Sequence, residues 1–235
     1  MARDQAMSGT LFGVGVGPGD PELLTLKAWR LIAGATTIAY LCANGGESTA
    51  LEIAKPFLPD TYTPIAINMP MRLERQPAQA AYDHGSDQIS KMLDQGLDVI
   101  FLCEGDPFFY GSFMYVFERL AKNHKVNVVP GVTSVSAASA EMQQPLVERD
   151  ETLKILPATM SAENLKSELA TASAAAIVKV GRHIDKVKTV LVELNLLDKA
   201  TAIEHATRST QIIRPLNEIT SNAVPYFTTI IVRRK

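Results

Sequence analysis

Short apolar runs alternate with amphipathic segments along the first half of the chain. The pattern predicts strands over 11–16, 36–41, 97–103 and 126–129, an extended segment over 62–69, and helices over 22–32, 48–56, 78–95 and 112–122. The run from Leu97 to Cys103 is almost continuously apolar, which is typical of a strand buried on both faces of a parallel sheet. Breaks containing glycine or proline follow most of these strands. The alternation therefore predicts an α/β domain with a mostly parallel sheet.

The second half of the chain contains less glycine and continues the same alternation. Strands are expected over 153–156, 174–180, 200–206 and 226–232, with helices over 164–170 and 186–194. Turn chemistry at Pro130-Gly131 marks the change in composition. The pattern predicts two α/β domains, residues 1–130 and 131–235.

Composition narrows the class of protein. The 235 residues include 23 Lys and Arg against 25 Asp and Glu, so the whole chain has no net attraction to nucleic acid or an anionic membrane. Its two cysteines cannot build a disulfide framework and suit a reducing compartment. Its four histidines lack metal-ligand spacing, so we expect no metal site. With no apolar run of about 20 residues, we expect a cytoplasmic protein.

The loop Gly13–Gly19 follows the first strand and looks at first like a dinucleotide fingerprint. The third glycine that a fingerprint requires is replaced by Pro18 or Asp20, depending on the register. Asp20 is also the expected helix cap, where its carboxylate would repel a phosphate. The second strand ends at Cys42 without an acidic residue for a ribose. The loop favours a positively charged ligand without phosphates; the alternative is a tight turn with no ligand.

Two further loops follow predicted strands, at the ends where open α/β sheets bind ligands. In the first, Asp106 can accept hydrogen bonds from ribose hydroxyls or an ammonium group, and Phe109 with Tyr110 can form an apolar wall. The small residues of the second loop, 129–138, leave room for a flat ring. The alternatives are an Asp-Pro turn with core aromatics, and a plain helix cap at Thr133 or Ser134.

Together these loops resemble the motifs of the tetrapyrrole (class III) methyltransferase family. The motifs are Gly13–Asp20 with Leu24-Thr25 behind it, Glu104–Pro107 and Val129–Ser134, and the similarity extends from Thr10 over essentially the whole chain. The stretch Phe101–Tyr115 is most similar to the precorrin-2 C20-methyltransferases of cobalamin biosynthesis. Glu104 stands where many other relatives carry glycine.

The resemblance implies a two-domain fold, with a mostly parallel N-terminal sheet, a mixed C-terminal sheet and a cleft between the domains. It also implies a homodimer and S-adenosylmethionine as methyl donor, with S-adenosylhomocysteine as product. By motif position, the implied donor contacts are Pro18, Gly105, Asp106, Phe109, Thr133, Ser134, Val180, Ala206 and Pro225. Relatives often carry Met at the position of Val180 and Gly at that of Ala206.

The implied reaction is methylation of C20 of precorrin-2 to give precorrin-3A. The acceptor carbon is electron-rich, so no strong base is required and no catalytic residue is assigned; Glu104 and Asp106 are the candidates for a weak base. Because the acceptor carries several carboxylates, we expect arginines to bind it. The candidates are Arg72, Arg75, Arg149 and Arg182, with His183 and Arg208 near other strand ends. A solvated surface role is the alternative for each arginine.

Other functions stay open from the sequence alone. Cobalt-factor II is an alternative acceptor, and RNA ribose or a modified histidine are more distant ones. A nicotinamide-dependent dehydrogenase and a non-catalytic nucleotide-binding module belong to other classes. Trp29 and His205 are expected in the core, and Cys103 is expected to be a small buried residue rather than a nucleophile.

Overall fold

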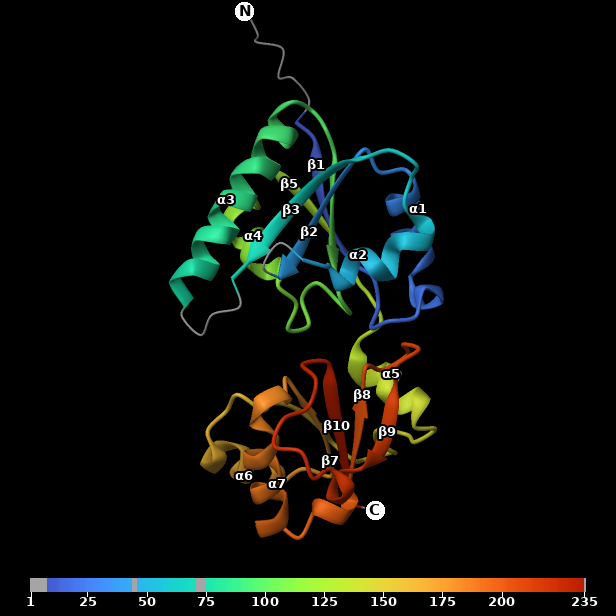
Figure 1. The fold of residues 1–235 in the computed structure, drawn as a ribbon, viewed down its shortest axis with the longest axis vertical. Helices are drawn as coiled ribbons and strands as arrows, with labels where there is room; N and C mark the ends of the chain where they lie inside the picture. The colour runs from blue at the N-terminus through green and yellow to red at the C-terminus, as the bar shows by residue number, and fades with distance from the viewer. Residues whose placement is uncertain (1–7, 44–45, 71–74, 235) are drawn as a thin grey trace, which may run out of the picture. The chain divides into compact units, whose positions relative to one another are not determined.

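A computed structural model describes residues 8–43, 46–70 and 75–234. The chain forms two compact units, which divide between Thr133 and Ser134 (Figure 1). Each unit has its own five-stranded sheet. No helix in the described ranges is long and apolar enough to cross a membrane.

The sheet of the first unit is entirely parallel, as the alternating pattern predicts. Its strand order is β3-β2-β4-β1-β5, so β1 lies between β4 and β5. The strands are β1 (Thr10–Gly15), β2 (Thr37–Ala43), β3 (Thr63–Met69), β4 (Val99–Cys103) and β5 (Lys125–Val129). The helices are α1 (Leu26–Ala33), α2 (Thr49–Ala54), α3 (Arg75–Asp94) and α4 (Phe113–Leu120), with 3-10 turns at Pro21–Leu23 and Lys55–Phe57.

Helices cover both faces of this sheet, with α3 and α4 on one side and α1 and α2 on the other (Figure 1). Strand β4 shows the consequence for its sequence. Phe101 and Cys103 pack toward α3 and α4, while Ile100 and Leu102 pack toward α1 and α2. All five residues of β4 are buried, which confirms the interpretation of the continuous apolar run.

The predicted helix over 22–32 is in fact two separate elements. Asp20 caps only the 3-10 turn, where its Oδ1 accepts a hydrogen bond from Glu22 N at 2.8 Å. Leu24 is extended, which ends that turn. Helix α1 then starts after Thr25, whose Oγ1 accepts from Ala28 N at 3.1 Å. Trp29 is 41% exposed rather than in the core, because Ala28 and Ile32 take the inward positions of α1.

Helix α3 starts at Arg75, three residues before the predicted start at residue 78. Pro77 does not prevent this, because a proline in the first helical turn sacrifices no internal hydrogen bond.

The second sheet is mixed, with strand order β6-β7-β10-β8-β9. Strands β6 and β7 are parallel, and β10 is antiparallel to both β7 and β8. The strands are β6 (Leu153–Pro157), β7 (Ala174–Val178), β8 (Ala200–Glu204), β9 (Ile212–Pro215) and β10 (Thr228–Arg233). The helices are α5 (Ser134–Glu141), α6 (Ala162–Ala170) and α7 (Ile184–Glu193), with 3-10 turns at Gly181–His183, Leu197–Lys199 and Leu216–Glu218.

Two predicted strands of this unit end earlier than expected. Strand β7 ends at Val178 and β8 at Glu204, because Lys179 and His205 turn to positive φ angles of 57° and 50°. Val180 and Ala206 therefore lie in loops. The edge strand β9 was not predicted. The first and last strands also shift by one or two residues, since β6 extends to Pro157 and β10 begins at Thr228.

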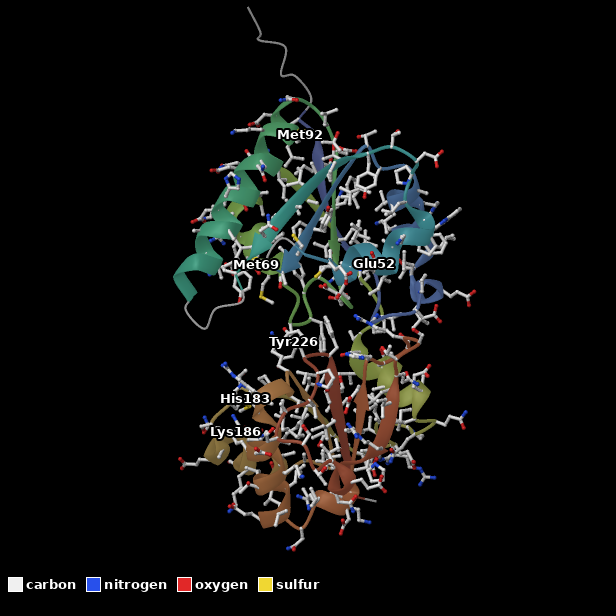
Figure 2. All side chains as sticks on the ribbon, viewed as in Figure 1. Glu52, Met69, Met92, His183, Lys186 and Tyr226 are labelled. Carbon is white, nitrogen blue, oxygen red and sulfur yellow. The ribbon has the colours of Figure 1, made fainter. Side chains whose placement is uncertain are left out.

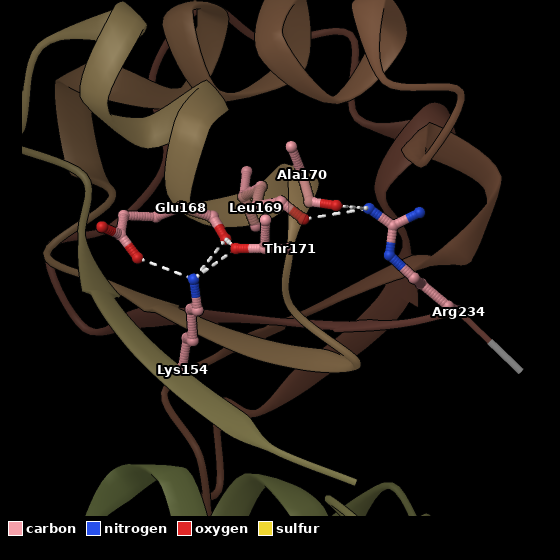
Figure 3. A network of polar contacts seen from close by, with 6 residues as sticks. All are labelled: Lys154, Glu168, Leu169, Ala170, Thr171 and Arg234. Carbon is pink, nitrogen blue, oxygen red and sulfur yellow. Dashed lines mark hydrogen bonds and ion pairs between the residues drawn. The ribbon is translucent and has the colours of Figure 1, made fainter.

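Basic side chains complete the C-terminal end of α6, as Figure 3 shows. Lys154 Nζ donates to the carbonyl oxygen of Glu168 at 3.0 Å and to its carboxylate at 2.8 Å. Arg234 donates to the carbonyl oxygens of Leu169 and Ala170, each at 3.0 Å. Cations at this position satisfy the last carbonyls and complement the helix dipole. They join α6 to β6 and to the end of the chain.

Candidate functional site

The loops that follow β1 and β4 are joined directly beyond the ends of the two strands. Val16 N donates to Cys103 O at 2.9 Å, and Gly105 N donates to Gly17 O at 2.8 Å. Gly17 N donates back to Gly105 O at 3.3 Å, which closes a small bridge. The first two sequence motifs therefore meet at the carboxyl edge of the sheet.

The glycines of this edge allow one loop to pack against another. A Cβ added to Gly131 would lie 2.0 Å from Gly105 O, and one added to Gly15 would lie 2.7 Å from the Gly131 Cα. Gly17 and Gly105 also have φ angles of +77° and +62°, which favour glycine. These glycines therefore let the three loops approach one another closely through their backbones.

Asp106 joins the second motif to the third. Its Oδ1 accepts from Phe108 N at 2.9 Å, and its Oδ2 accepts from Gly131 N at 3.0 Å. Both carboxylate oxygens thus hold backbone N–H groups from two different loops. Asp106 fixes the shape of the edge, in addition to any contact it makes with a ligand.

The start of α1 offers no ready phosphate site. The Thr25 hydroxyl already accepts from Ala28 N, and Asp20 and Glu22 place two carboxylates in the preceding turn. Anions bind at helix starts through free N–H groups, and the carboxylates would repel them. The start of α1 therefore disfavours a dinucleotide, although Thr25 rather than Asp20 caps the helix.

Aromatic side chains line the loop after β4. Phe109 is partly buried and its ring meets that of Tyr110 edge-on, with 5.4 Å between the ring centres. Tyr110 is exposed and has a φ of +56°. Phe108 packs edge-on against Phe117 of α4, with ring centres 5.1 Å apart. These contacts hold apolar rings at the edge where Asp106 lies.

The predicted contacts of the second unit also gather at one sheet edge. Strand β10 is antiparallel to β7 and β8, so the start of β10 lies beside their ends. Val180 and Ala206 are buried there, and Pro225 is partly buried. His205 N donates to Phe227 O at 2.9 Å, and Val224 N donates to Gly181 O at 3.4 Å.

Ser134 lies at the start of α5 in this second unit. Its Oγ is 3.5 Å from Thr229 Oγ1 on β10, which donates to it. Pro18, Gly105, Asp106, Phe109 and Thr133 belong to the first unit.

Two of the predicted cations, Arg182 and Arg208, lie at the edge of the second sheet where β7 and β8 end and β10 begins. Arg182 is exposed in the turn that leads into α7. His183 of the same turn and Lys186 of α7 are labelled in Figure 2. Burial, followed by the charges of Lys186 and Arg182, lowers the pKa of His183 and favours its neutral form. The Arg208 guanidinium stacks over the Phe227 ring, 4.6 Å from its centre. Cations and exposed aromatic surface therefore occur together.

The structure does not bring Arg149 to this edge. Arg149 precedes β6 and lies at the opposite end of the second sheet. It lines a cavity of about 350 Å³ together with Glu148, Asp150, Glu151 and Ser173. Arg72 lies outside the described residues, and Arg75 is the first residue of α3.

The buried thiols are poor nucleophiles. Burial, with a smaller contribution from Glu104, raises the pKa of Cys103 to about 12, and burial also raises the pKa of Cys42. Cys103 is only 2% exposed, which confirms it as a small buried residue. His205 is partly exposed rather than in the core, and its Nδ1 is 3.1 Å from Thr210 Oγ1.

Comparison with known families identifies the family to which the chain belongs. A model of the tetrapyrrole (corrin/porphyrin) methylases matches residues 10–220. The chain belongs to the tetrapyrrole methylase family. Among solved tetrapyrrole methylases, the cobalt precorrin-4 methyltransferase CbiF superimposes with a TM-score of 0.71 at 20% identity, over 95% of this chain and 94% of CbiF. This similarity confirms the predicted α/β fold class.

A second solved neighbour is the uroporphyrin-III C-methyltransferase of Thermus thermophilus in complex with S-adenosyl homocysteine. It superimposes with a TM-score of 0.68 at 21% identity, over 96% of this chain and 92% of that protein. This neighbour likewise supports the tetrapyrrole methylase fold.

Curated tetrapyrrole methylases show higher identity. The precorrin-2 C(20)-methyltransferase of Sinorhizobium sp. is 34% identical over 232 residues, 95% of each chain. The cobalt-precorrin-2 C(20)-methyltransferase of Salmonella typhimurium is 27% identical over 97% of this chain and 98% of that protein. The CobIJ protein of Mycobacterium tuberculosis is 41% identical over 93% of this chain, but the chain spans only 45% of its length.

Proposed function

We propose that this chain is an S-adenosylmethionine-dependent C-methyltransferase that methylates C20 of precorrin-2 to give precorrin-3A in cobalamin biosynthesis. The match to the Sinorhizobium precorrin-2 C(20)-methyltransferase, which spans nearly the whole of both chains, carries this proposal. The Salmonella relative, named for the cobalt-containing precorrin, favours a second candidate acceptor with cobalt already inserted.

The carboxyl edge of the first unit's sheet suits this donor in charge and shape. S-adenosylmethionine supplies a methyl group on a positively charged sulfonium and carries no phosphate. The turn before α1 holds two carboxylates, which disfavour a phosphate, and the Thr25 hydroxyl already caps the helix. Asp106 fixes two loops of the edge by accepting from Phe108 N and Gly131 N. Such fixed loops orient a donor, and orientation lowers the barrier to group transfer.

The proposed donor contacts are those that the family resemblance implies. In the first unit they are Pro18, Gly105, Asp106, Phe109 and Thr133, and in the second Ser134, Val180, Ala206 and Pro225. The apolar members exclude water from the reacting groups. Water exclusion favours a step in which the positive charge of the donor is dispersed.

The acceptor side requires recognition rather than strong base chemistry. An electron-rich carbon attacks without prior deprotonation, so the residues around it mainly bind and orient the macrocycle. Arg182 supplies a guanidinium for its carboxylates, and Arg208 presents one stacked on Phe227. Arg72, Arg75 and Arg149 stay predicted acceptor contacts, with Arg149 at the far end of the second sheet.

The test is incubation of the full chain with methyl-labelled S-adenosylmethionine and precorrin-2, with and without cobalt inserted. Label at C20 of the metal-free macrocycle, located by mass and NMR, is the expected result. Transfer only to the cobalt form would favour the second candidate. Binding of adenosylhomocysteine without transfer to either form would contradict the enzymatic proposal. Tight binding of NAD in place of adenosylhomocysteine would favour a dehydrogenase.

We further propose that the protein acts as a cytoplasmic homodimer. The family resemblance supports the dimer, and the two buried free cysteines suit a reducing compartment. Light scattering coupled to size exclusion would measure twice the 25.5 kDa of one chain if the dimer is correct. Cell fractionation tests the location.

A further inference from the structure

The turn between β8 and β9 holds a strained backbone beside Ala206. His205 and Thr207, the two residues that flank Ala206, have φ angles of 50° and 67°. Side chains with a branched Cβ rarely adopt this left-handed region, so Thr207 is an outlier. A strained conformation persists only where its surroundings fix it, and such residues cluster at functional sites.

The length of the turn does not require this strain. The ladder pairs Glu204 with Ile212, so residues 205–211 form the connection. Two antiparallel strands can be joined by only two residues, and longer connections have room to relax. The strain at Thr207 is therefore imposed by specific contacts rather than by a short chain.

Gln211 contacts the backbone of the strained residue. Its Oε1 accepts from Thr207 N at 2.5 Å, while its Nε2 donates to Glu141 Oε2 at 2.7 Å. Because a carboxylate accepts hydrogen bonds and does not donate them, Glu141 selects the orientation of the amide that presents Oε1 to Thr207. Glu141 is the last residue of α5, so this chain of contacts ties the turn to a helix.

We propose that Gln211, oriented by Glu141, is a positioning residue for donor binding: it fixes the backbone of Thr207 and so sets the place of Ala206. The inference rests on the proposed function, since Ala206 is a proposed donor contact. Gln211 acts through the turn and need not touch the donor. No sequence pattern indicates this role, because Gln211 and Glu141 are 70 residues apart.

The first test measures adenosylhomocysteine binding by calorimetry in the full chain carrying Gln211→Ala. We expect its Kd to rise roughly 3- to 10-fold, the range for loss of one positioned hydrogen bond. The KM for the donor should rise in parallel, while kcat at saturating donor stays within about two-fold. Glu141→Gln can donate as well as accept, so it no longer selects the orientation of the Gln211 amide, and its Kd should rise by less than that of Gln211→Ala. Gln88→Ala, at an exposed position of α3 in the other unit, is the matched control.

The second test repeats Gln211→Ala in a Thr207→Gly background. Glycine adopts a positive φ without strain, so the added effect of Gln211→Ala should be much smaller there. An undiminished effect, or a Kd for Gln211→Ala within two-fold of the unaltered protein, would overturn the positioning role. Absence of any binding by the unaltered protein would instead contradict the proposed function, together with the inference that rests on it.

Discussion

At the scale of single residues, the site depends on glycine, because the absence of a Cβ lets its loops pack closely. Gly131 packs against Gly105 and Gly15, and its N–H is held by Asp106. In Gly131→Ala the new Cβ would lie 2.0 Å from a backbone oxygen, so one of the loops must move. We expect the variant to lose about 1–3 kcal/mol of unfolding free energy, as overpacked sites do, and to bind adenosylhomocysteine more weakly. Urea unfolding and calorimetry measure the two effects.

Gly34→Ala is the matched control for this prediction. A Cβ there would meet only Arg30 O, at 3.5 Å, which is an ordinary contact, and Gly34 has a φ of −98°. Its stability should stay within about 0.5 kcal/mol of the unaltered protein. Equal stability of the two alanine variants would show that the loop junction does not depend on glycine.

At the scale of elements, α1 allows two capping residues to be compared. Thr25 caps an eight-residue helix, whereas Asp20 caps a three-residue turn. Thr25→Ala removes the acceptor for Ala28 N and should destabilise the protein by about 1 kcal/mol, the usual loss for a helix cap. Asp20→Ala should have a smaller effect. Urea unfolding of both variants measures the difference, and the reverse order would mean that Asp20 supports the helix after all.

Elements buried on both sides are predictable from sequence, and elements shaped by their neighbours are not. Strand β4 is predicted because helices cover both of its faces, which makes all its residues apolar. Strand β9 is a sheet edge whose Ile212 and Ile213 are both exposed, so neither an alternating nor a continuous apolar pattern marks it. Asp20 and Thr25 are both good cap residues, and only the extended backbone at Leu24 shows which one begins α1.

At the scale of the whole molecule, strand order decides which predicted site residues meet. Asp106 and Gly131 come together because β4 and β5 both neighbour β1. The motifs and the family resemblance identify these residues, but their contact depends on that order. Arg149 and Arg182 show the opposite case. Both lie near predicted strand ends. Arg149 precedes β6 and Arg182 follows β7, and because these two strands are parallel, the two arginines lie at opposite ends of the strands of the second sheet.

The hydrophobic core of the second unit is separate from the two clusters of the first unit, which predicts that the second unit folds alone. The buried cluster of the second unit runs from Leu156 to Val232, and every strand ladder pairs strands of the same unit. A boundary at 130 would detach Gly131 from the Asp106 carboxylate that binds its N–H, so the fragment is cut after Thr133.

We expect the fragment 134–235 to give a dispersed NMR spectrum and cooperative urea unfolding, because about 100 residues suffice for a stable core. A shorter fragment, 171–235, is the control. It lacks β6 and α6 and therefore loses Leu156, Leu165 and Leu169 from the core, so it should stay unfolded. If 134–235 were equally unfolded while the full chain folds, the second unit would depend on the first for its stability. The chain would then be one cooperative domain rather than two.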